Sequence, residues 1–80
     1  MTVKDAVALR FLQICREQEI SVNELATRSG VTPSTVYSMM DSRRREISIT
    51  TIKKLCDGLE MTLGEFFSTE GFDSLEQEIQ

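Results

Sequence analysis

The sequence predicts a small all-α domain. Its 80 residues contain segments with apolar side chains at the three- and four-residue spacing of helices, and residues that favour helix ends stand between them. One proline, four glycines and 40% apolar residues fit a compact helical chain. A chain of this length forms one domain with a small core. We therefore expect a compact fold of five helices. Whether a short extra helix follows at the C-terminus is left undecided by the sequence.

The first helix is expected from about Lys4 to Gln18. Its apolar side chains recur at helical spacing in a stripe that is broad enough for packing on other helices. We therefore assign this stripe to the core. It consists of Val3, Val7, Phe11, Ile14 and Gln18, and is widened by Ala8, Leu12 and Cys15.

Residues 21–40 predict two short helices joined by a tight turn. Ser21 and Glu24 have the spacing of a capping box, in which the serine oxygen accepts a backbone N–H and the glutamate reaches back to the serine N–H. A helix over 22–29 is therefore expected to begin there. Gly30 adopts the left-handed backbone conformation without a Cβ penalty, so this helix is expected to end at that glycine.

The second helix of the pair is expected over 33–40. Thr32 is a favourable N-cap, and Pro33 suits the first helical position because its missing N–H is not needed there. The apolar side carries Val36, Met39 and Met40, and the polar side carries Ser34, Thr35 and Ser38. Two short helices around a glycine turn form the layout of a helix-turn-helix, in which the second helix lies in the DNA major groove.

Two more helices and a tail follow. Ser48 is expected to cap a helix that runs to about Leu59, and a second capping box, Thr62 with Glu65, opens the fifth helix. Beyond residue 68 an acidic segment keeps one apolar stripe at helical spacing, and so short a helix needs a cover for that stripe. Docking on the same domain, a dimer contact and a frayed end all remain open. The stripe consists of Phe72, Leu75 and Ile79.

The motif and the segments after it match one known family in register. The matching residues are Leu25-Ala26, Gly30-Val31-Thr32, Ser34-Thr35-Val36 and Met39, followed by Ile47-Ser48, Leu55, Leu59, Met61-Thr62-Leu63 and Glu65-Phe66-Phe67. The chain resembles the lambda repressor and Cro-like (XRE) helix-turn-helix family over about residues 6–67. A match of this length is more specific than a lone motif.

The resemblance implies a set of DNA-contacting residues. The helix over 33–40 is expected in the major groove, and the loop after it, which holds three consecutive arginines, is expected along the phosphates, because guanidinium groups donate paired hydrogen bonds to phosphate oxygens. Asn23 and Thr50 lie near helix N-termini, which favour anions. The base-facing set is Pro33, Ser34, Tyr37 and Ser38, and the phosphate set is Asn23, Thr32, Thr35, Arg43, Arg44, Arg45 and Thr50.

The chain departs from the family pattern in two places. Related proteins often carry Gln, Arg or Asn at the positions of Pro33 and Ser38, and these longer side chains make paired contacts to bases. Readout is therefore expected to depend on Tyr37, bridging water and DNA shape. The alternative for Tyr37 is a half-buried packing residue, which is common for a tyrosine on a short helix. The family also commonly pairs an arginine with a glutamate where this chain has Cys15 and Met40, and an apolar pair can replace a partly buried ion pair without loss of stability.

The net charge of −4 is unevenly distributed. All nine lysines and arginines lie within residues 1–59, whereas residues 60–80 hold six of the thirteen acidic residues and no basic one. Because a local basic face decides phosphate binding, an anionic chain can still bind DNA. We divide the chain into a helix-turn-helix domain over 1–69 and an acidic amphipathic tail over 70–80.

Composition argues against several other classes of protein. Cys15 and Cys56 fall at apolar helix positions and are expected to be buried thiols. With no histidine and no paired Cys motif, neither a metal site nor a cofactor is expected. The chain has no glycine-rich phosphate loop and no nucleophile–base pair, so we expect no enzyme. It has no apolar run of about 18 residues and no signal cleavage site, so a cytoplasmic protein is expected.

Two functions from different classes follow from these observations. The first is a transcriptional regulator of the repressor type that binds double-stranded DNA sequence-specifically as a homodimer on paired half-sites. The second is a protein-interaction module, such as an antitoxin-like adaptor, that keeps the fold but binds DNA weakly. The acidic balance, the small base-facing side chains and the amphipathic tail favour the second.

Overall fold

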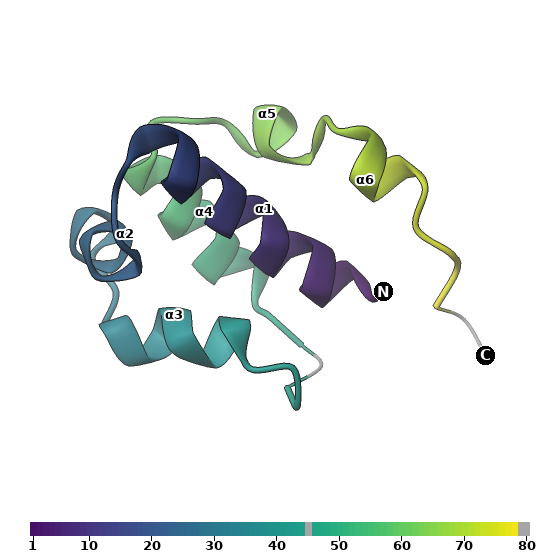
Figure 1. Cartoon of the computed structure of the whole chain (residues 1–80), viewed down its shortest axis with the longest axis horizontal. Coiled ribbons are helices and arrows are strands. Elements are labelled where there is room, and N and C mark those ends of the chain that lie inside the picture. The colour runs from purple at the N-terminus through teal and green to yellow at the C-terminus, as the bar shows by residue number, and fades with distance from the viewer. Residues whose placement is uncertain (45, 79–80) are drawn as a thin grey trace.

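The computed structural model describes residues 1–44 and 46–78, and within these ranges the chain forms six α-helices and no strand (Figure 1). The predicted all-α fold is confirmed, and the short extra helix is present. The helices are α1 (Val3–Gln18), α2 (Val22–Ser29), α3 (Pro33–Met40), α4 (Ile49–Gly58), α5 (Leu63–Phe67) and α6 (Glu70–Asp73).

The helices surround one hydrophobic core. In Figure 1, α1 crosses in front of α4, α3 lies along one side of this pair, and α5 and α6 lie along the other side. The helix α2 packs against both α3 and α4, and thereby fixes α3 on the body of the domain. The fully buried side chains come from five of the helices: Val7, Phe11, Leu25, Ala26, Val36, Leu55, Cys56 and Phe66.

Aromatic contacts attach the C-terminal segment to this core. The ring centroids of Phe11 and Phe66 are 4.3 Å apart. The rings of Phe66, Phe67 and Phe72 contact one another, with centroids separated by 4.8–5.8 Å. Phe72 therefore docks α6 on its own domain. The predicted helical stripe does not extend to Leu75, because α6 ends at Asp73. The third residue of the stripe, Ile79, lies outside the described residues.

The first helix differs from its prediction at both its start and its outer face. It begins at Val3, because Thr2 and Asp5 form a capping box that the sequence analysis missed. Val3, Leu12 and Gln18 are exposed, although the periodicity placed them in the stripe that faces the core. The reason is that the neighbouring helices cover a narrower part of α1 than its apolar residues span.

One hydrogen bond and one close backbone approach hold the helices in place. Lys4 is 4% exposed, and its Nζ donates a hydrogen bond to the backbone carbonyl oxygen of Asp41, which ties the start of α1 to the end of α3. Gly58 at the end of α4 lies directly against α2. A Cβ on Gly58 would be 2.2 Å from Oγ of Ser29 and 3.0 Å from its backbone N, so only glycine allows this approach.

Candidate DNA-binding surface

The turn between α2 and α3 has the geometry that its residues predict. Gly30 has a φ of 70°, and its N–H donates to the carbonyl oxygens of Ala26 and Thr27. The Ser21 hydroxyl accepts a hydrogen bond from the N–H of Glu24 at 3.0 Å. The reciprocal half of the predicted capping box is absent, because the Glu24 carboxylate instead forms an ion pair with Arg28 at 2.9 Å.

The start of α3 is built differently from the prediction. Pro33 occupies the first turn, as expected, but the Thr32 side chain makes no capping bond. The Thr32 backbone carbonyl oxygen accepts a hydrogen bond from the N–H of Thr35 at 3.0 Å, so the N–H that the Thr32 hydroxyl would cap is already paired. The Thr32 hydroxyl instead lies 3.0 Å from the hydroxyls of both Ser34 and Thr35, and these three groups form a hydroxyl cluster at the helix N-terminus.

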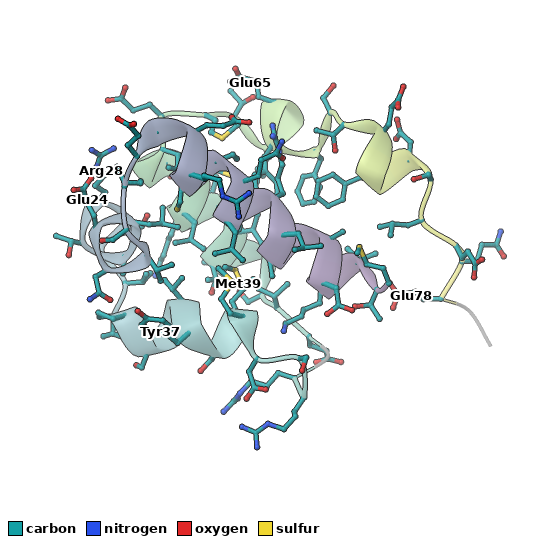
Figure 2. The ribbon with its side chains drawn as sticks, viewed as in Figure 1. Glu24, Arg28, Tyr37, Met39, Glu65 and Glu78 are labelled. Atoms are coloured by element: carbon teal, nitrogen blue, oxygen red, sulfur yellow. The ribbon has the colours of Figure 1, made fainter. Side chains whose placement is uncertain are left out.

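The outward face of α3 collects the four predicted base-facing residues. Pro33, Ser34 and Tyr37 are exposed and Ser38 is half-buried, whereas Val36 and Met39 are buried beneath them. The Tyr37 side chain is 55% exposed, so the alternative of a half-buried packing residue does not describe it (Figure 2). Because α3 contains no acidic residue, this face presents hydroxyls and apolar surface without a carboxylate.

Two residues of the predicted phosphate set lie at the starts of α2 and α4. Asn23 and Thr50 are exposed, and each lies in the first turn of its helix, where N–H groups lack an intrahelical partner. In each turn one such N–H is already capped, that of Glu24 by Ser21 and that of Thr51 by Ser48. A shallow groove connects α3, the loop after it and the start of α4. Its lining residues are Thr35, Ser38, Met39, Arg44, Glu46, Ile47, Ser48 and Thr51.

The arginine loop is partly neutralised by the chain itself. The Arg43 guanidinium donates through Nε and one terminal nitrogen to the two carboxylate oxygens of Asp41, at 3.1 Å and 3.0 Å. These hydrogen bonds, together with one from the Arg43 N–H, lower the pKa of Asp41 to about 2. Arg44 is exposed, and Arg45 lies outside the described residues. The sequence showed three equivalent arginines and gave no sign of this pair.

The described part of the acidic tail, residues 70–78, does not cover the outward face of α3. The Glu78 carboxylate accepts a hydrogen bond from the N–H of Val3 at 2.9 Å, at the start of α1. Figure 2 shows Glu78 there, well apart from Tyr37 on α3. The helix α6 packs against α1, on the opposite side of the domain from α3 (Figure 1).

Comparison with known protein families matches residues 10–71 to the Cro/C1-type HTH DNA-binding domain. The chain belongs to the Cro/C1-type helix-turn-helix family. A solved structure titled "Crystal structure of the prophage Lp1 protein 11" shares 28% identity with it, at a TM-score of 0.84 over 94% of this chain and 99% of that one. A search of curated proteins found no match.

Membership of the Cro/C1-type family confirms the resemblance seen in the sequence and assigns DNA binding and transcription regulation to the domain. The departure at Cys15 and Met40 fits this fold, because Cys15 is buried and Met40 packs against the core. No helix within the described ranges is long and apolar enough to cross a membrane. Residues 1–44 and 46–78 contain no cluster of His, Cys, Asp or Glu that could hold a metal ion.

Proposed function

We propose that this Cro/C1-type domain is a sequence-specific repressor that inserts α3 into the major groove and binds paired half-sites as a homodimer. The observation that carries the proposal is the carboxylate-free outward face of α3, with Ser34 and Tyr37 exposed and Arg44 beside it. A short helix that presents its N-terminal residues in this way fits the width of the major groove. Repression then needs only that the bound domain blocks access to a promoter.

The two sets of residues have different roles in this proposal. The hydroxyls of Ser34 and Ser38, the ring of Pro33 and the phenol of Tyr37 contact base edges. The phosphate contacts fix the position of the domain on the duplex but carry no sequence information. They come from Asn23, Thr32, Thr35, Arg43, Arg44, Arg45 and Thr50, of which Arg43 contacts phosphate only in part because its guanidinium is paired with Asp41.

Selection of bound sequences from a random double-stranded DNA pool tests this function. The expected result is a palindrome with half-sites about one helical turn apart. Arg44→Ala should weaken binding to all sequences about equally and lower the salt dependence by about one phosphate contact. Ser34→Ala should instead change the preference among sequences. If no sequence is enriched and binding at low salt stays weaker than about 100 μM, which is the weak end of non-specific affinity, the proposal is wrong and the adaptor function is favoured.

A further inference from the structure

The outer face of α1 exposes two leucines, and none of the helices in the described residues covers them. Leu9 is 52% exposed and Leu12 is 36% exposed, and neither takes part in the core. Asp5 and Arg16 lie on the same face, because at 3.6 residues per turn all four side chains fall within a sector of about 60°. We call these four residues the α1 ridge.

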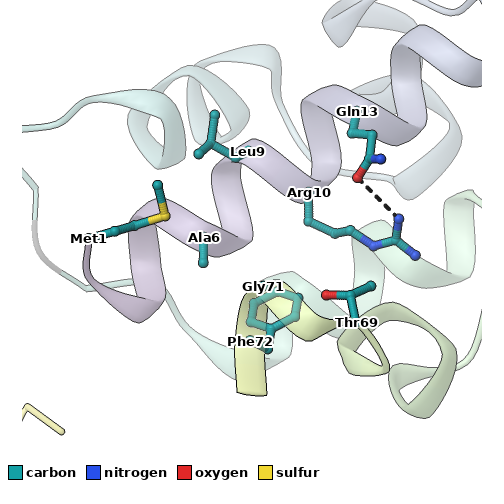
Figure 3. A pocket seen from close by; sticks show the side chains of 8 residues that line it. All are labelled: Met1, Ala6, Leu9, Arg10, Gln13, Thr69, Gly71 and Phe72. Carbon is teal, nitrogen blue, oxygen red and sulfur yellow. Dashed lines mark hydrogen bonds between the residues drawn. The ribbon is translucent and has the colours of Figure 1, made fainter. Parts of the chain in front are cut away.

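Hollows lie on both sides of the α1 ridge. Figure 3 shows Leu9 at the rim of the first, which lies between α1 and α6 and is also lined by Ala6 and Phe72. The second lies towards the end of α3, where Ala8, Leu9, Leu12 and Met40 line it. A ridge of side chains between two grooves is the surface that a second helix packs against.

The charges of the α1 ridge indicate that the second helix is α1 of another copy of the chain. In an antiparallel pair of identical helices related by a twofold axis, the residue numbers of two facing residues add up to the same value at every position along the pair. With the axis between Leu9 and Leu12, each of these leucines faces the other in the second copy. The same axis places Asp5 opposite Arg16, so opposite charges meet at both ends.

We propose that two copies of the chain associate through the α1 ridge, as an antiparallel pair of α1 helices with Leu9 against Leu12 and Asp5 against Arg16. Each charge lies four residues, or about 6 Å along the axis, from its nearer leucine, so the apolar and charged contacts form in one register. Arg16 is exposed and is engaged in none of the ion pairs found among the described residues.

This arrangement leaves the DNA-binding surface free. In Figure 1, α1 lies in front of α4, and α3 lies along one side of it. A twofold axis perpendicular to α1 and within the contact plane therefore keeps both α3 helices on the same side of the dimer, as paired half-sites require. Each copy contributes only two leucines, so the interface is small and association in solution is weak. Association is strengthened when DNA holds two copies side by side. Only this last step rests on the proposed function.

The test uses the full chain without DNA, so that its failure is separate from a failure of DNA binding. Sedimentation up to about 1 mM protein, the range of effective concentrations on a shared template, is expected to show monomer–dimer exchange. Arg16→Asp places like charges opposite each other twice and should weaken association at least tenfold. Adding Asp5→Arg to that variant should restore it, whereas Glu17→Lys, a neighbouring exposed charge reversal, should leave it unchanged.

A measurement on the unmodified chain covers the case in which Asp5→Arg disturbs the helix cap. In a mixture of labelled and unlabelled protein, isotope-filtered NMR should show contacts between Leu9 methyls of one copy and Leu12 methyls of another. A chain that stays monomeric at about 1 mM overturns the proposal, as does an Arg16→Asp variant that associates like the parent. Equal weakening by Glu17→Lys, or intermolecular contacts that lack the leucines, would overturn it too.

Discussion

The Asp41–Arg43 pair is predicted to hold back DNA affinity, and Asp41→Asn should increase it. The pair places a carboxylate on a guanidinium in the loop that is proposed to meet phosphates. Because the pKa of Asp41 is about 2, the pair is intact at every pH used for binding assays. Asparagine keeps the side-chain oxygen that accepts the Arg43 N–H, so the loop backbone is retained while the competing charge is removed.

The expected gain follows from counterion release. One additional arginine–phosphate contact steepens the dependence of log affinity on log salt by about 0.9. If Arg43 then makes one full contact, affinity rises about eightfold at 0.1 M salt and about threefold at 0.3 M salt. Fluorescence anisotropy on a fixed duplex over a salt series measures both the gain and the slope.

Asp57→Asn is the matched control. It removes the same charge from another carboxylate in an ion pair, because Asp57 binds Lys53 at the far end of α4. We expect its affinity gain to stay below about twofold and its salt slope to match the parent, since only long-range attraction changes. Should Asp41→Asn bind no more tightly than Asp57→Asn, or show an unchanged slope, Arg43 is not held away from phosphate.

Three further predictions concern stability and reactivity. Gly58→Ala should destabilise the domain by about 1–3 kcal/mol in urea unfolding, because the added Cβ meets Ser29. Gly64→Ala should be neutral or stabilising, because a Cβ there has no neighbour closer than 3.8 Å among the described residues. Equal effects of the two substitutions would refute the close approach at Gly58. The Cys56 thiol, whose pKa is raised to about 11 mainly by burial, should react with a disulfide reagent at pH 8 no faster than the domain opens, and rapid labelling of the folded chain would contradict this. Hydrogen bonds lower the pKa of both Asp41 and Glu65. The stability that these carboxylates contribute is therefore present above their usual pKa values of 3.8 and 4.5, and it is lost as pH falls through the lowered values. A urea midpoint that stays constant from pH 5 to pH 2 would count against these contacts.

The sequence was sufficient for the features that depend on local chemistry. Gly30 ends α2 because only a residue without Cβ adopts a φ of 70° at no cost, and Pro33 starts α3 because its fixed backbone suits the first turn. The prediction that Val36 and Met39 lie on the apolar, core-facing side of their helix was also correct, because helical periodicity gathers the apolar residues of a short helix on one side. These features lie within a few residues of their cause, and together with the match in register over about residues 6–67 they were enough to predict the fold and the family.

Only the tertiary structure decided features that depend on the distance between segments. The exposure of Leu12, the burial of Lys4 against Asp41 and the docking of Phe72 all depend on which helix lies opposite, and periodicity along one helix does not contain that information. The Asp41–Arg43 pair depends on the loop bringing two side chains together, where the sequence shows only neighbouring charges. An apolar pattern states that a face needs cover, but the length and direction of the neighbouring helices determine how much of that face is covered.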